Sequence, residues 1–250
     1  MLQGCLNGAR PMDAHPALPV TPYELARDAR MMARYGVGSV HIHPRSPDGK
    51  ETLAPMHVGD AVAAIRSAVV GIEIGVPAAR WVQPDWQDRV HAVLAWGRLG
   101  VGMPDSVAVN VHDMGWREVC AAAQSVGMGI ELGVWTIGDA VTLRHAGLPP
   151  GTVRLVVEPT EPGMAVDEAI RIMRTLGQPG VPVLVHGEDA GAWPVFDYAM
   201  EHHLDARIGL EDTLNGRDGW LARGNEDLIE MALGISTASP RRRRADRGSR

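Results

Sequence analysis

The chain has 250 residues, of which 45% are apolar and 22% are charged, a composition typical of a globular protein. No apolar run approaches the roughly 18 residues that a membrane span needs, and no basic segment followed by an apolar one begins at Met1. The two cysteines, Cys5 and Cys120, are too few for a disulfide framework. We therefore expect a soluble, cytoplasmic protein that has no membrane partner.

Charge is unevenly distributed along the chain. The net charge is −6, but the last ten residues hold six arginines and one aspartate, so residues 1–240 carry 18 basic and 29 acidic side chains, a net charge of −11. An acidic body is not typical of nucleic-acid-binding proteins, which carry a basic face within the fold. We expect no nucleic-acid partner, and we interpret residues 239–250 as a solvated, disordered, arginine-rich tail.

Apolar runs of strand length alternate eight times with helical patterns. The expected strands are residues 2–8, 39–45, 73–78, 106–113, 129–136, 154–160, 181–189 and 206–213. The expected helices are residues 22–35, 57–69, 84–96, 116–126, 137–145, 165–176, 193–203 and 225–235. Thr21, Pro22 and Glu24 are typical of the start of a helix, because they combine a capping box with proline at the first helical position.

Eight strand and helix units in a chain of this length predict one α/β domain, a (β/α)8 TIM barrel over residues 1–238. An open, doubly wound sheet is the alternative. It is disfavoured because Gly4, Gly8 and the residues after them do not form the glycine-rich fingerprint of dinucleotide-binding sheets.

Two histidines two residues apart indicate a metal site at the end of the second strand. In a strand, this spacing aims His41 and His43 at the same face, about 7 Å apart along the chain. A closed barrel brings the last strand beside the first, so Glu211 is the expected third ligand, and three ligands with one open position are typical of catalytic zinc. A structural alternative is that one histidine caps a loop and the other fills a cavity. His186 and Glu188 form a competing pair of possible metal ligands.

Further polar side chains cluster where the expected strands end, which is the active-site face of such barrels. They are Asn7, Asn110, His112, Asp113, Glu131, Trp135, Glu158, Asp189, Arg207 and Asp212. Arg207 either serves catalysis or makes a packing ion pair with a neighbouring carboxylate, and Asp212 either acts as a general base or caps a loop. Six other tryptophans are expected to pack on helices: Trp81, Trp86, Trp96, Trp116, Trp193 and Trp220.

Lys50 is the only lysine, and it lies in a polar turn. Enzymes that make or break carbon–carbon bonds beside a carbonyl commonly store the developing negative charge in a lysine Schiff base or on a metal-bound oxygen. The absence of a lysine at any expected strand end therefore favours metal chemistry over a Schiff base.

The chain resembles the β-keto acid cleavage enzymes, the family that includes 3-keto-5-aminohexanoate cleavage enzyme. Five segments carry the resemblance: Cys-Leu-Asn-Gly-Ala-Arg at 5–10, His-Pro-Ala-Leu-Pro-Val-Thr-Pro at 15–22, His-Ile-His-Pro-Arg at 41–45, Glu-Leu-Gly-Val-Trp-Thr at 131–136 and Arg-Ile-Gly-Leu-Glu-Asp-Thr-Leu at 207–214. They occur in the same order as in the family, and the likeness extends from residue 5 to about residue 235.

The resemblance implies a zinc-dependent barrel that uses a β-keto acid and acetyl-CoA to make acetoacetate and a new acyl-CoA. It also implies a homo-oligomer, commonly a tetramer in the family. On this resemblance the zinc ligands are His41, His43 and Glu211, and the catalytic residues are Arg207, Asp212 and Glu131. We also expect Asn7, Arg10, Arg80 and Asn110 to bind substrate, since they lie at or just after the expected strand ends.

The chain departs from the family pattern after the third strand. The family has a Ser-Thr-Gly turn there that contacts substrate, whereas this chain has Val-Pro-Ala-Ala-Arg at 76–80. Some members also have an acidic residue in place of Arg10, so Arg10 or Arg80 would favour an acid or a phosphate of CoA. Two rival functions stay open: a metal-dependent lyase or hydrolase that does not use CoA, and a non-catalytic barrel that binds a small acid.

Overall fold

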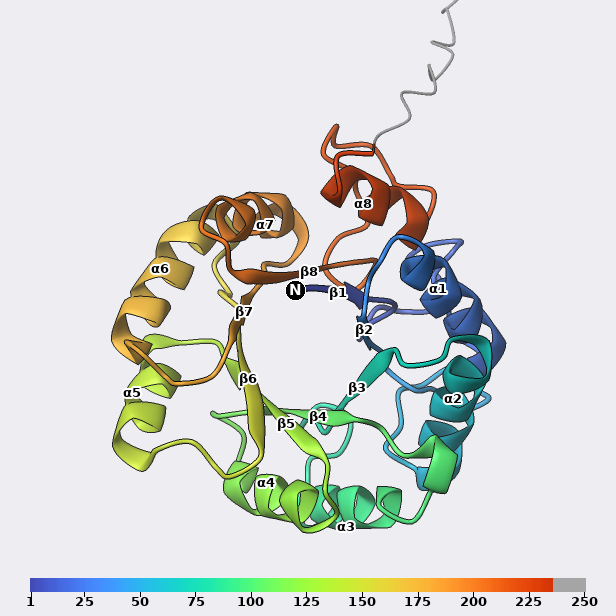
Figure 1. Cartoon of the computed structure of the whole chain (residues 1–250), viewed down its shortest axis with the longest axis vertical. Helices are drawn as coiled ribbons and strands as arrows, with labels where there is room; N and C mark the ends of the chain where they lie inside the picture. The colour runs from blue at the N-terminus through green and yellow to red at the C-terminus, as the bar shows by residue number, and fades with distance from the viewer. Residues whose placement is uncertain (236–250) are drawn as a thin grey trace, which may run out of the picture.

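Eight parallel strands form a closed barrel that is surrounded by eight helices in a computed structural model of the chain. The structure describes residues 1–235. Neighbouring strands pair in sequence order, and β8 returns to pair with β1 (Figure 1). The predicted TIM barrel is therefore confirmed, whereas the predicted tail at 239–250 and the domain limit at 238 lie outside the described residues.

The strands are β1 Leu2–Cys5, β2 Ser39–His41, β3 Glu73–Pro77, β4 Ser106–Asn110, β5 Gly129–Val134, β6 Thr152–Val157, β7 Val183–Val185 and β8 Asp205–Ile208. The helices are α1 Pro22–Arg34, α2 Pro55–Ala68, α3 Trp86–Trp96, α4 Trp116–Ser125, α5 Ile137–Ala146, α6 Ala165–Leu176, α7 Ala192–Glu201 and α8 Asn225–Ala232. Short 3-10 turns occupy Gly100–Gly102, Pro162–Met164 and Asp189–Gly191. None of these helices has the length and hydrophobicity needed to cross a membrane.

Local signals explain most of the helix boundaries. Thr21 caps α1 in the predicted capping box, in which its hydroxyl accepts from Glu24 N–H and the Glu24 carboxylate accepts from Thr21 N–H. Two helices begin away from the predicted positions: α2 starts two residues early with Pro55 in its first turn, and α3 starts two residues late because Asp85 is its N-cap.

The apolar core lies between the barrel and its ring of helices, and the inside of the barrel is polar. Aliphatic side chains such as Val40, Ile74 and Leu132 are fully buried in the core. TIM barrels usually fill their interior with bulky branched residues. Here the floor of the barrel is instead a hydrogen-bonded polar group, in which half-buried Glu73 joins the buried residues Gln3, Ser39, Ser106, Glu131 and Arg154.

The closure of the barrel at β1 sets the positions of residues from both ends of the chain. Cys5 pairs in register with His41 of β2, and Gln3 pairs with Arg207 of β8. The backbone after β8 passes very close to β1, because a Cβ on Gly209 would collide with the carbonyl oxygen of Cys5. Only glycine fits this close approach.

We expect Gly209→Ala to destabilise the protein by about 1–3 kcal/mol, since the added methyl group forces β8 away from β1. The free energy of unfolding in urea measures the effect. Gly38→Ala is the matched control, because Gly38 is exposed and a Cβ there meets no described atom within 4 Å. Equal stability of the two variants would contradict the close approach.

Candidate metal centre and active site

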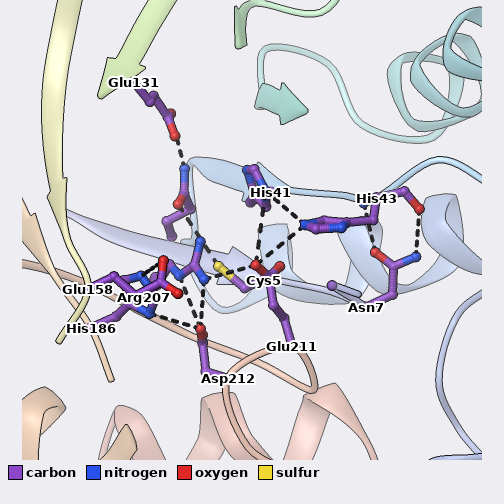
Figure 2. Close-up of polar contacts among 12 residues, drawn as sticks. Cys5, Asn7, His41, His43, Glu131, Glu158, His186, Arg207, Glu211 and Asp212 are labelled. Carbon is purple, nitrogen blue, oxygen red and sulfur yellow. Dashed lines mark hydrogen bonds and ion pairs between the residues drawn. The ribbon is translucent and has the colours of Figure 1, made fainter. Parts of the chain in front are cut away.

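Three buried side chains converge at the mouth of the barrel, where β1, β2 and β8 meet. His41 Nε2 lies 3.2 Å from His43 Nε2, and Glu211 Oε1 lies 4.0 Å from His41 Nε2 and 3.6 Å from His43 Nε2. Figure 2 shows the Glu211 side chain extending towards the two rings. The structure thus brings together residues that are about 170 positions apart in the sequence.

These three side chains fit a divalent metal. Ligands about 2.0–2.2 Å from a tetrahedral zinc are roughly 3.3 Å from one another, close to the separations of the three atoms here. Their possible ligand atoms all lie within 4.8 Å of one another, and all three residues are buried. Glu211 Oε2 is also buried and has no hydrogen-bond partner among the described residues. A cation bound to the two ring nitrogens and the carboxylate would give this unpaired oxygen a partner.

The two imidazoles differ in pKa because their electrostatic environments differ. Burial lowers the pKa of His41 to about 3, so its ring is neutral. Burial acts on His43 in the same direction, but the carboxylates of Glu211 and Glu51 outweigh it and raise the pKa of His43 to about 9. Burial alone would raise the pKa of Glu211, yet the Arg207 guanidinium holds it well below its usual range.

The first strand and its loop hold His43 in place. Asn7 donates from Nδ2 to the carbonyl oxygen of His43 at 2.9 Å and accepts from its backbone N–H at 2.9 Å. Asn7 is fully buried and does not line the cavity. On the far side of the ring, His43 Nδ1 lies 2.5 Å from Glu51 Oε2. Both contacts orient the ring so that Nε2 faces Glu211.

Arg207 carries the buried positive charge of the site. Its NH2 group donates to Glu211 Oε1 at 2.8 Å, and its Nε donates to Asp212 Oδ1 at 3.0 Å. Burial disfavours the charged guanidinium, but these carboxylates outweigh that cost and hold the pKa of Arg207 well above its usual value. The packing ion pair considered from the sequence therefore exists, and Arg207 also lines the cavity.

A second chain of polar contacts runs from Asp212 to the opposite wall. Asp212 is fully buried, and its Oδ1 lies 3.2 Å from His186 Nδ1. His186 Nε2 lies 3.2 Å from Glu158 Oε2, and Glu158 lines the cavity whereas Asp212 does not. Asp212 Oδ2 has no hydrogen-bond partner in the part of the chain that the structure describes. His186 therefore pairs with Glu158 and Asp212. Among the described residues, no cluster of three or more possible metal ligands contains His186 and Glu188.

A cavity of about 370 Å³ opens beside these groups. Its charged and polar lining comprises Arg10, His41, His43, Asn110, Glu131, Glu158, Glu188, Arg207 and Glu211. Glu131 forms its floor, where Ser106 Oγ donates to Oε1 at 3.1 Å and burial raises the pKa of the carboxyl. Burial, followed by repulsion from Glu158, raises the pKa of Glu188 to about 7.

Only some of the residues predicted to bind substrate line the cavity. Asn110 and Arg10 line the cavity. Arg10 also donates hydrogen bonds to Asp189 Oδ1 at 2.5 Å and to the Glu211 carbonyl oxygen at 3.1 Å. Arg80 has two-thirds of its side chain exposed and lies outside the cavity, 3.6 Å from Asp113.

Two residues of the site were not predicted. Trp81 was expected to pack on a helix, and this is wrong: it lies in the loop after β3 and lines the cavity with Trp135, their ring centroids 6.2 Å apart. Glu51 was missed altogether. The Asp48-Gly49 pair was an available signal, because such a pair predicts a tight turn that returns the chain towards His43.

The fold and the site together define a barrel enzyme with a candidate metal centre at the carboxyl ends of its strands. A profile of the beta-keto acid cleavage enzyme family matches residues 1–243, and the chain belongs to this family. The family is described as enzymes that cleave β-keto acids, and membership supports this class of enzyme for the chain.

Solved structures of other enzymes share the barrel. A type I 3-dehydroquinate dehydratase from Clostridium difficile has a TM-score of 0.61 at 10% identity, over 94% of this chain and 90% of that one. A 3-dehydroquinate dehydratase from Geobacillus kaustophilus has a TM-score of 0.61 at 11% identity, over 96% and 92% of the two chains. At these identities the similarity shows the fold alone.

Replacing both imidazoles by alanine, in His41→Ala/His43→Ala, should abolish metal binding, because a single carboxylate is left of the three donors. The metal content of purified protein, measured by mass spectrometry, should fall from about one equivalent per chain to near zero. Circular dichroism checks that the variant folds. A folded double variant with its metal retained would disprove this centre.

Proposed function

We propose that the protein is a zinc-dependent β-keto acid cleavage enzyme that transfers acyl groups between a β-keto acid and acetyl-CoA. The products are acetoacetate and a new acyl-CoA. The convergence of His41, His43 and Glu211 beside the cavity supports this proposal most strongly, together with family membership. Three nitrogen and oxygen ligands in a buried cluster suit zinc, which commonly keeps a fourth position for substrate in catalytic sites.

Zinc, when bound by these three residues, supplies a Lewis acid that polarises a carbonyl oxygen and stabilises negative charge developing on it. The side chains around it have separate tasks. Arg207 fixes Glu211 and Asp212 through two hydrogen bonds and offsets their charge. Glu131 and Asn110 contact the substrate from the floor and the wall of the cavity.

Asp212 is the proposed general base. Arg207 holds its Oδ1, so Oδ2 is the oxygen available to take a proton from the carbon between the keto group and the carboxylate. Because Asp212 does not line the cavity, this carbon must approach beside Arg207. Glu158 and His186 continue the polar chain beyond Asp212 and restrain its side chain.

The reaction balances without another reagent. The deprotonated carbon of the β-keto acid forms a bond to the acetyl carbonyl carbon of acetyl-CoA, and the CoA thiolate moves to the keto carbon of the original acid. The bond between that keto carbon and its neighbour then breaks, the neighbouring carbon takes back the proton that Asp212 had accepted, and acetoacetate is released. Arg10 at the cavity rim and exposed Arg80 are proposed to attract the acidic groups of the two substrates.

The oligomeric state and the location are further parts of this proposal. We propose a homo-oligomer, a tetramer on the family resemblance, that acts in the cytoplasm. Sedimentation of the purified chain would test the subunit number.

The function is tested by incubating zinc-loaded protein with a panel of β-keto acids and measuring acetoacetate and acyl-CoA by mass spectrometry. We expect both products to form in equal amounts and only when acetyl-CoA is present. Acetoacetate release without acetyl-CoA would instead select a lyase or hydrolase. Binding of keto acids with no turnover across the panel would select a non-catalytic barrel.

Asp212→Asn should lower kcat by about 10²–10⁴-fold, since an amide cannot accept the proton. The variant keeps a hydrogen-bond acceptor for Arg207, so its metal content and unfolding temperature should stay near those of the wild type. Steady-state kinetics with the best substrate of the panel measures the effect. A kcat within a few-fold of the wild type would remove Asp212 from the proposed mechanism.

A further inference from the structure

A short hairpin after β2 brings a carboxylate to the outer side of the metal centre. Residues 44–52 double back through backbone hydrogen bonds, and Arg45 and Glu51 form an antiparallel bridge. The buried Arg45 guanidinium donates to the carbonyl oxygens of Gly49 and Gly8, at 3.0 and 2.9 Å, and so fastens the hairpin to the loop after β1. Glu51 is therefore held by backbone bonds on both sides of the turn.

Glu51 contacts two residues of the cavity with a single oxygen. Its Oε2 lies 2.5 Å from His43 Nδ1 and accepts from Trp81 Nε1 at 3.3 Å. The Glu51 side chain is only 16% exposed. One half-buried carboxylate thus connects a candidate metal ligand with the aromatic wall of the cavity.

The contact with His43 has a chemical consequence for the opposite ring nitrogen. When Nδ1 carries the proton and donates a hydrogen bond to Glu51, Nε2 presents its lone pair towards Glu211 and a bound metal. Outer carboxylates of this kind fix the tautomer and increase the basicity of the ligand. His41 lacks such a partner, because its Nδ1 is buried and makes no hydrogen bond to any described residue.

Trp81 restrains this arrangement from the cavity side. Its ring is nearly parallel to the His43 ring, with an interplanar angle of 18° and centroids 6.5 Å apart. About half of Trp81 is exposed, and it lines the cavity from the loop after β3. The indole N–H therefore limits the positions that the Glu51 carboxylate can adopt.

We propose that Glu51 is a positioning residue of the metal centre, and that Trp81 holds it in place, so that the cavity wall contributes to metal affinity. This inference rests on the metal centre of the proposed function. It concerns affinity for the ion, and it does not require any particular keto acid or the use of CoA.

The test measures zinc affinity of the full-length protein by competition with a chromophoric chelator. Glu51→Gln should weaken zinc binding about 10–100-fold, because an amide is a weaker partner for the imidazole N–H. Glu51→Asp should recover part of this loss, since it keeps the charge. Trp81→Phe should weaken binding by only about five-fold, because it removes one hydrogen bond and keeps an aromatic ring.

Matched controls use residues that do not line the cavity. Glu118→Gln removes an exposed carboxylate of α4, and Trp193→Phe removes an indole N–H that donates to Asn215 at 2.9 Å. Both should bind zinc as the wild type does. The visible spectrum of the cobalt-substituted protein gives a second readout, and its bands should shift in Glu51→Gln and not in the controls.

The outcomes separate this inference from the proposed function. If the wild type binds zinc and both Glu51→Gln and Trp81→Phe bind it equally well, the positioning role is wrong and the metal centre stands. If the wild type binds no divalent metal, the positioning role and the proposed function are both wrong. If Glu51→Gln does not fold, Trp81→Phe still tests the proposal. A zinc affinity of Trp81→Phe equal to that of the wild type would overturn the role of Trp81 in holding Glu51.

Discussion

The site depends on one constraint, the pairing of β1 with β2 on one side and with β8 on the other. This closure brings the carboxylate of Glu211 within 4.0 Å of both histidines, although it follows them by about 170 residues. The closure is sterically tight because Gly209 lies directly against the Cys5 backbone. The metal centre therefore requires the complete barrel, and a fragment that lacks either end of the chain would lack it.

Charge balance is the second requirement of this arrangement. Burying the carboxylates of Glu211 and Asp212 is unfavourable unless a cation compensates for them, and Arg207 provides one with hydrogen bonds to both. The same guanidinium keeps Glu211 ionised, as a metal ligand must be. The ion pair therefore lies within the candidate site, and the packing role of Arg207 is compatible with the catalytic role proposed for it.

The sequence was sufficient for the barrel and for the metal cluster, because both follow from periodic patterns and from the known closure of eight such units. His41 and Glu211 were found in this way. Glu51 and Trp81 could not be found so directly, since both lie in loops whose paths depend on tertiary contacts rather than on periodicity. The burial of polar residues was equally hard to predict: nothing in the local sequence of Glu131 shows that three polar residues, Gln3, Ser106 and Arg154, contact it in the barrel floor.

The hairpin that carries Glu51 lies outside the barrel strands, in the loop between β2 and α2. Substitutions there can accumulate without disturbing the strand pairing, while they alter how firmly His43 is oriented. If Glu51 orients His43 as proposed, changes in this turn would alter the affinity for the metal and leave the side chains inside the barrel unchanged. Relatives that differ mainly in this turn would then differ in their metal dependence more than in their chemistry.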